Sequence, residues 1–446
     1  MTHLHDNEVE RFIQSDLTPE ERRKVVRHLL TGCRPCRARL MSIQEVLFRA
    51  EDLEETARGV GSFSYDAVLA RVVPRALRFQ ARHRKESKLL ERAFEAVSQK
   101  ESDEISNEIL VLQGWPRVEA LLRLSFEERY RDPQRMLLLA FSARLAAEQL
   151  DASVLGLGLV ADFQGRAWAE ISNAYRVNDQ FEMAEAALGQ AQRFFDDGAQ
   201  DTLLLARMAD VKASLRMDQR RLGEAVDLLT VVYDLYCWVG DLHLAGRALV
   251  KSGIATHYEG QPREAVSLLR KGLHLLSPER DPRLLAIGRQ SLLDAMVACG
   301  DFLEAGQILL GGGLRQAFAT DPLNLLKLRW VEGKVLAGLG KLSRAERVFG
   351  EVKEEFLLRN RDYDAALVGL ELAAIWLQQG KVARVQELAE ETYEILRDLG
   401  IHQEAFKAVL VLREACRQQA VTLGLLRHVH DFLVRLEWNP HLRFEL

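Results

Sequence analysis

The sequence lacks any apolar run of the roughly 18–20 residues that a bilayer-spanning helix requires. The best candidate, residues 365–377, is about 13 residues long and contains Glu371. The N-terminus carries charges and histidines where a secretion signal would have an apolar segment. We therefore expect a cytoplasmic protein with no membrane association.

Recognisable catalytic motifs are also missing. Gly156-Leu157-Gly158 lacks the third glycine and the preceding strand of a nucleotide-binding loop, and Gly311-Gly312-Gly313 lacks the required lysine and hydroxyl. We expect the second glycine run to break a helix instead. There is no His-Glu-x2-His sequence or nucleophile elbow, and carboxylates are scattered over polar faces. The sequence therefore predicts a protein that is not an enzyme.

Cysteines are few, and no strong charge imbalance points to a partner. The five cysteines include three isolated ones on helical patterns, which suits a reducing cytosol: Cys237, Cys299 and Cys416. We expect these three to be buried as small apolar residues. A net charge of −5 on 446 residues is mild. A basic run at residues 71–88 could bind nucleic acid, but the acidic residues that follow favour a solvated helix face. Nucleic acid is therefore not an expected partner.

What is present is a repeat. Small residues, alanine in all but the last unit, recur at a near-constant interval of about 40 residues, at Ala184, Ala225, Ala265, Ala305, Ala345 and Val385. Four glycines each precede one of these positions by five residues: Gly260, Gly300, Gly340 and Gly380. A small residue lets two helices approach closely, and a glycine can end a helix in the left-handed conformation. A fixed period of this length indicates stacked helical hairpins.

The first repeat carries a recognisable pattern, formed by Trp168, Ile171, Ser172, Tyr175, Asp179, Phe181, Ala184, Leu188 and Ala191. This spacing resembles the tetratricopeptide repeat (TPR) family, with about 40 residues per unit in place of the family's 34. The resemblance covers about residues 165–435 and implies an all-α fold built as a solenoid. It also implies a concave surface, lined mainly by the first helix of each hairpin, that binds a protein or peptide.

Near the N-terminus, Cys33 and Cys36 form a Cys-x2-Cys pair directly after a helical segment that carries His28. Two thiolates from a tight turn and a histidine from the preceding helix can converge on one zinc ion, which needs a fourth ligand. His3 or His5 could supply it. The helix should begin with a capping box at Thr18 and Glu21. A redox-active cysteine pair and a metal-free dithiol are the alternatives.

These residues resemble the zinc-containing anti-sigma factor domain, in which a histidine and a Cys-x2-Cys motif bind zinc and helices bind a sigma factor. By position, the resemblance implies the ligands His3, His28, Cys33 and Cys36, with His5 in reserve. Two departures stand out. The gap from His28 to Cys33 is four residues where the family has three, and the transmembrane helix that often follows the domain is absent.

The chain should therefore divide into a zinc-finger module at residues 1–45, a helical linker at 46–120, an irregular helical cap at 121–164 and a TPR-like solenoid with a C-terminal cap at 165–446. Over residues 115–150 we expect paired helices, with Leu124-Ser125-Phe126 between them and Asp132-Pro133 starting the second. The apolar ending at residues 439–444 should fold back onto the last helices.

Five basic residues fall on first-helix segments and would suit an acidic or C-terminal carboxylate group: Arg166, Lys212, Lys251, Arg289 and Arg329. Ordinary surface positions are the other interpretation. Two functions follow. The chain is either a bacterial anti-sigma-type transcription regulator, with a second protein bound by its array, or an interaction scaffold whose zinc is purely structural. A redox switch at Cys33 and Cys36 is a third, weaker alternative.

Overall fold

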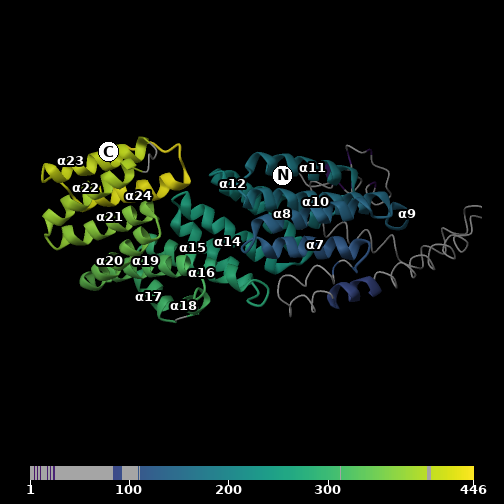
Figure 1. The fold of residues 1–446 in the computed structure, drawn as a ribbon, viewed down its shortest axis with the longest axis horizontal. Coiled ribbons are helices and arrows are strands. Elements are labelled where there is room, and N and C mark those ends of the chain that lie inside the picture. The colour runs from purple at the N-terminus through teal and green to yellow at the C-terminus, as the bar shows by residue number, and fades with distance from the viewer. Residues whose placement is uncertain are drawn as a thin grey trace, which may run out of the picture. The chain divides into compact units, whose positions relative to one another are not determined.

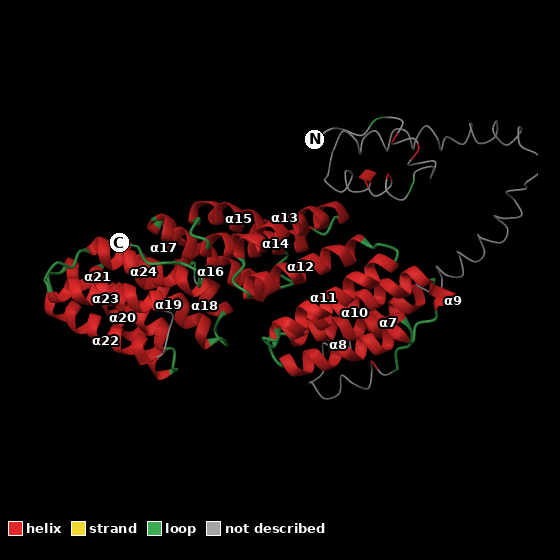
Figure 2. Cartoon of the chain, turned by 90° about the horizontal axis from the view of Figure 1, so that it is seen from above, coloured by secondary structure: helices red, strands yellow, loops and turns green. Residues whose placement is uncertain are grey.

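The computed structural model describes residues 111–311, 313–398 and 403–445 almost without interruption. It also describes residues 84–92, residue 109 and seven isolated positions: His5, Glu8, Arg11, Thr18, Glu21, Lys24 and Val25. Every regular element in this part of the chain is a helix, and helices appear throughout Figure 2. The predicted all-α class is thus confirmed for the described residues.

The long described segments form consecutive helices joined by short turns (Figure 1). Their bounds are α7 Trp115–Glu128, α8 Pro133–Glu148, α9 Ala152–Leu155, α10 Leu157–Val177, α11 Phe181–Asp197, α12 Thr202–Asp218, α13 Leu222–Val239, α14 Leu242–Tyr258, α15 Pro262–Leu275, α16 Pro282–Cys299, α17 Phe302–Leu310, α18 Gly313–Ala317, α19 Pro322–Gly338, α20 Leu342–Leu358, α21 Asp362–Gln378, α22 Val382–Asp398, α23 Gln403–Arg417 and α24 Leu423–Trp438. We call α10, α12, α14, α16, α19, α21 and α23 the first helices of their hairpins, and α11, α13, α15, α17, α20 and α22 the second helices.

The chain divides into two compact units. Unit 1 comprises Met1–Val211 and Cys237–Gly240, and unit 2 comprises Lys212–Tyr236 and Asp241–Leu446. In unit 1, α7 packs on α8, α8 on α10 and α10 on α11. In unit 2, each helix from α14 to α17 packs on the next, and so does each helix from α19 to α24, while α19 packs on both α16 and α17.

The repeat predicted from the sequence is present in the structure. All five alanines of the repeat are fully buried, and Val385 is 1% exposed. The four register glycines, residues 260, 300, 340 and 380, have φ between 72° and 88°. This left-handed conformation ends the first helix and lets the second one start two residues later. Full burial of these alanines is what close packing of the two helices of a hairpin requires.

Three further expectations concern individual positions. Gly311 ends α17, so the glycine run does break a helix. Phe444 is buried against Phe432, with ring centroids 5.0 Å apart, so the apolar ending folds back as predicted. Cys416 is buried, whereas Cys237 and Cys299 are only partly covered.

The predicted break at Leu124-Ser125-Phe126 is wrong. Helix α7 continues through this segment to Glu128, and the turn to α8 lies at residues 129–132. Ser125 is fully buried and donates a hydrogen bond from its hydroxyl to the Met136 carbonyl at 2.8 Å. The serine therefore joins the two helices, while Asp132 caps α8 by accepting from the Arg135 N–H at 2.9 Å.

Candidate functional site: the first-helix face of unit 2 and helix α24

The predicted zinc ligands His3, His28, Cys33 and Cys36 lie outside the described residues. His5, the reserve ligand, is exposed, and its backbone N–H donates to Glu8. The capping box is confirmed, because the Glu21 N–H donates to the Thr18 hydroxyl at 3.3 Å and the Thr18 N–H donates to the Glu21 carboxylate at 3.0 Å. Among the described residues, no three His, Cys, Asp or Glu side chains are grouped so as to hold a metal.

Three of the five basic residues predicted for the concave surface already have partners within the chain. Arg166 pairs with Glu119, Arg329 with Glu351 on the second helix α20, and Lys251 donates to the Ser214 hydroxyl at 2.6 Å. In the register of the repeat, moreover, the five residues occupy four different positions. Arg166, Arg329 and Lys251 are therefore held by groups of the chain itself, and binding of an acidic ligand by this set stays a prediction.

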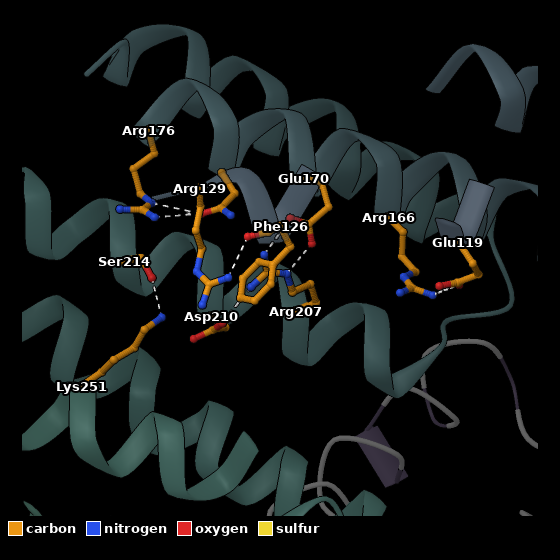
Figure 3. A network of polar contacts seen from close by, with 11 residues as sticks. Glu119, Phe126, Arg129, Arg166, Glu170, Arg176, Arg207, Asp210, Ser214 and Lys251 are labelled. Atoms are coloured by element: carbon orange, nitrogen blue, oxygen red, sulfur yellow. Dashed lines mark hydrogen bonds and ion pairs between the residues drawn. The ribbon is translucent and has the colours of Figure 1, made fainter. Parts of the chain in front are cut away.

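In unit 1, polar side chains on neighbouring helices form hydrogen bonds and ion pairs with one another (Figure 3). The Arg207 guanidinium donates two hydrogen bonds to the Glu170 carboxylate, at 2.6 and 2.7 Å, and a third to Asp210 at 3.0 Å. Both carboxylates are buried. The Arg129 guanidinium lies 3.9 Å from the ring centroid of Phe126 and donates to its carbonyl. A buried, paired network of this kind holds helices in register, and Arg207 is not available as a ligand contact.

In unit 2, the last helix packs against the first helices. Helix α24 contacts α21 as well as its neighbour α23, and Figure 1 shows the three side by side. The Tyr363 hydroxyl on α21 donates to the Leu433 carbonyl at 2.8 Å, and His430 Nε2 lies 3.3 Å from a carboxylate oxygen of Glu371, also on α21. Helix α24 therefore packs on α21, the first helix of the preceding hairpin, in addition to its own neighbour α23.

The far end of α24 reaches the hairpins at the start of unit 2. The Trp438 ring stacks on Tyr258 at the end of α14, with centroids 3.7 Å apart and an interplanar angle of 10°. The Arg220 guanidinium lies 4.1 Å from the centroid of the same ring. Since both neighbours lie at stacking distance, they cover opposite faces of the indole. This three-layer contact, which we call the clasp, joins the two ends of unit 2 in the sequence.

Arg220 breaks the glycine rule of the repeat. It lies one repeat before Gly260, in the same register, and has a φ of 63°. A side chain in this left-handed region costs of order 1–3 kcal/mol. Asp179 holds the same register position one repeat earlier, with a φ of 58°, so the missing glycine alone does not single out Arg220. The contact with Trp438 gives Arg220 its physical role. The two aromatic members, Tyr258 and Trp438, carry no signal of this contact in the sequence either.

Several titratable groups with shifted pKa values lie on the first helices of unit 2 and on α24. Burial raises the pKa of Asp294 on α16 to about 6, although Lys334 and Lys327 on α19 act in the opposite direction. Burial lowers the pKa of His257 on α14 to about 4, and Lys334 acts in the same direction. Burial also raises the pKa of Glu437 on α24, as does Asp364. We call Tyr258, Asp294, Lys327, Tyr363 and Glu371 the first-helix face of unit 2.

Asp294 should make the stability of unit 2 depend on pH. Its carboxyl gains a proton near pH 6 in the folded state but only near 3.8 when unfolded, so this group stabilises the fold progressively as the pH falls between these values. Replacing Asp294 with asparagine removes this pH-dependent contribution to the free energy of unfolding. The stability of Asp294→Asn relative to the parent should therefore be greater at about pH 7.5 than at about pH 4.5.

Urea unfolding midpoints of both chains at the two pH values measure this difference. His257 works in the opposite direction but is common to both chains, so its contribution cancels in the comparison. An equal difference in unfolding midpoint between the two chains at both pH values would contradict a raised pKa for the Asp294 carboxyl.

Solved structures share this architecture. A Rap protein complexed with competence and sporulation factor is similar over 72% of this chain and 87% of its own length, with 12% identity and a TM-score of 0.52. At this identity the likeness concerns the fold. The chain has a TPR-like helical-repeat fold.

Two further solved structures align over 64% of this chain with 14% identity and a TM-score of 0.45. One is the apo form of RapI, covered over 98% of its length. The other is a signal-transduction ATPase with a tetratricopeptide repeat sensor from Pyrococcus horikoshii, covered over 43%. No protein-family model and no curated protein matches the chain. Among the helices of the described residues, none is long and apolar enough to cross a membrane.

Proposed function

We propose that this chain is a non-enzymatic, cytoplasmic regulator that acts by binding proteins. One observation carries the proposal: the first-helix face of unit 2 already holds a helix, α24, through a stacked aromatic pair, a tyrosine hydrogen bond and buried apolar residues. A face that accommodates an amphipathic helix of its own chain has the chemistry to accept a partner's helix. The Rap structure with its bound factor supports this use of the fold.

The binding property of this face can be tested with α24 itself. A chain ending after Gln419 should bind a labelled peptide of residues 420–446, whereas the intact chain should not, because its face is occupied. Circular dichroism establishes that the shortened chain is folded. A peptide with Leu433→Asp is the matched control, since Leu433 is fully buried in the intact chain. A folded, shortened chain that ignores the parent peptide would contradict the proposal.

More specifically, we propose that the chain regulates transcription as an anti-sigma factor does, by binding a sigma factor. We propose that His3, His28, Cys33 and Cys36 hold a structural Zn²⁺ ion, and that the module they form binds a sigma factor. Support comes from the spacing of these residues and from the confirmed capping box at Thr18 and Glu21. The intact protein should release about one zinc ion per chain on thiol modification, and the Cys33→Ser variant should release none.

The alternative is an interaction scaffold with a purely structural zinc module. The two functions differ in where the partner binds. An anti-sigma regulator requires a fragment of residues 1–60 to bind a sigma factor by itself. A scaffold requires partner binding to remain with residues 120–446. Titrating both fragments with purified sigma factors distinguishes them, and binding to neither fragment nor the intact chain would remove the anti-sigma function.

A further inference from the structure

Next to the clasp lies a pocket of about 410 Å³, within the range that holds small molecules. Two turns of the repeats form one side of it, at residues 220–224 and 258–261. The end of α24 and the chain after it form the other side, through Arg435, Asn439 and Leu442. The pocket therefore exists only while α24 is docked.

Most of the charged groups at this pocket are already paired. Arg221 binds the Glu224 carboxylate at 2.6 Å, and Arg216 binds the same carboxylate at 3.2 Å. Arg220 is stacked on Trp438. These side chains line the pocket, but their charged groups are already engaged and do not offer an ion pair to a ligand.

Two charged side chains at the pocket remain to be considered, the cationic Arg435 and the anionic Glu259. Within the part of the chain that the structure describes, the charged groups of Arg435 and Glu259 form no ion pair or hydrogen bond. The Arg435 side chain lies over Gly260, where a Cβ atom would come 3.4 Å from Nε. The Glu259 carboxylate lies beside Gly223, where a Cβ atom would come 3.3 Å from it. Both charged groups thus approach backbone at a glycine and line the same space.

The environment of Glu259 favours a cationic partner. Burial raises the pKa of this carboxyl, and Asp227 and Glu264 act in the same direction. A positive group placed in the pocket would relieve this repulsion. Arg435 offers a planar guanidinium, which suits a carboxylate. Leu222 and Leu442 add apolar lining.

We propose that this pocket binds a small zwitterion, an apolar amino acid whose carboxylate pairs with Arg435 and whose ammonium group pairs with Glu259. The apolar side chain contacts Leu222 and Leu442. The two ends of a short apolar peptide carry the same pair of charges, so peptide and free amino acid are separated by experiment.

Because one side of the pocket belongs to α24, the ligand binds the docked form better than an open one. By linkage, occupancy stabilises the docked form and opposes any partner that needs the first-helix face. This regulatory effect rests on the proposed protein-binding function, whereas ligand binding itself does not.

Isothermal titration of the intact chain tests the inference with L-leucine, N-acetyl-L-leucine, L-leucinamide and leucyl-leucine. Leucine should bind. N-acetyl-L-leucine, which lacks the ammonium group, and L-leucinamide, which lacks the carboxylate, should each bind at least about tenfold more weakly, because the first leaves Glu259 unpaired and the second leaves Arg435 unpaired. Tighter binding of leucyl-leucine than of leucine would assign the site to a peptide, which overturns the free amino acid as the ligand.

Two variants assign the charges. Arg435→Gln should abolish the preference for leucine over leucinamide, and Glu259→Gln should abolish the preference for leucine over N-acetyl-leucine. Arg427→Gln, on the same helix, and Glu354→Gln, at an exposed position of α20, are the controls and should change neither. No binding of leucine or leucyl-leucine, or equal affinity for charged and capped probes, overturns the site. If leucine binds but does not protect α24 amides from hydrogen exchange, the site stands and only its regulatory effect fails.

Discussion

Replacing Phe349 with alanine should lower the free energy of unfolding of unit 2 by about 3–5 kcal/mol. Phe349 lies on α20 and is fully buried. Its ring occupies the space left by a glycine on the neighbouring first helix: a Cβ atom at Gly333 would lie 2.5 Å from the ring. The alanine variant loses the apolar burial and leaves a cavity that rigid helices can fill only in part.

Urea denaturation monitored by helical circular dichroism measures this loss. Phe349→Leu is the matched control, because it keeps most of the volume and should cost less than half as much as the alanine variant. Equal stability of the alanine variant and the parent would mean that α19 and α20 do not pack through this ring.

The second large effect is expected where α14 and α15 cross. Their backbones approach so closely that a Cβ atom at Gly272 would lie 2.8 Å from the Val250 nitrogen and 2.9 Å from the Gly246 oxygen. Gly272→Ala should therefore force the helices apart and destabilise unit 2 by about 1–3 kcal/mol. The contact is with backbone, which cannot move aside as a flexible side chain could.

Gly350→Ala provides a control with the opposite sign. Gly350 lies in the middle of helix α20, and nothing lies within 4 Å of the Cβ position there. Alanine should stabilise this helix by roughly 0.5–1 kcal/mol, because it loses less conformational entropy on folding than glycine does. Thermal unfolding of both variants should show shifts in opposite directions. A stabilising Gly272→Ala would contradict the close crossing of α14 and α15.

Much of the array could be predicted because its physics is local and repeated. The alanines that let helices cross and the glycines that end them recur once per repeat, so the period gives each hairpin its place. The break expected at residues 124–126 is absent, because the Ser125 hydroxyl donates to the Met136 carbonyl and so ties α7 to α8. Propensity does not encode such a tertiary hydrogen bond.

The candidate site was predicted least well, for the same reason. Trp438 and Tyr258 lie several repeats apart in the sequence, and nothing in the periodicity brings them together. Arg220 stands in a glycine position, but Asp179 does so too, and the register therefore does not mark the clasp. The basic residues expected on the binding surface were chosen by helix and not by register, and three of the five pair within the chain. The zinc ligands remain a prediction.

The central claim, that the chain regulates by binding proteins and carries a sigma-binding zinc module, is tested most directly by affinity capture from native cytosol followed by mass spectrometry. The intact protein is compared with a Cys33→Ser, Cys36→Ser variant. We predict that the intact chain retains a sigma factor and that the variant loses it. A partner list that contains no sigma factor and does not change in the variant would contradict the anti-sigma function and leave a scaffold that works through its array.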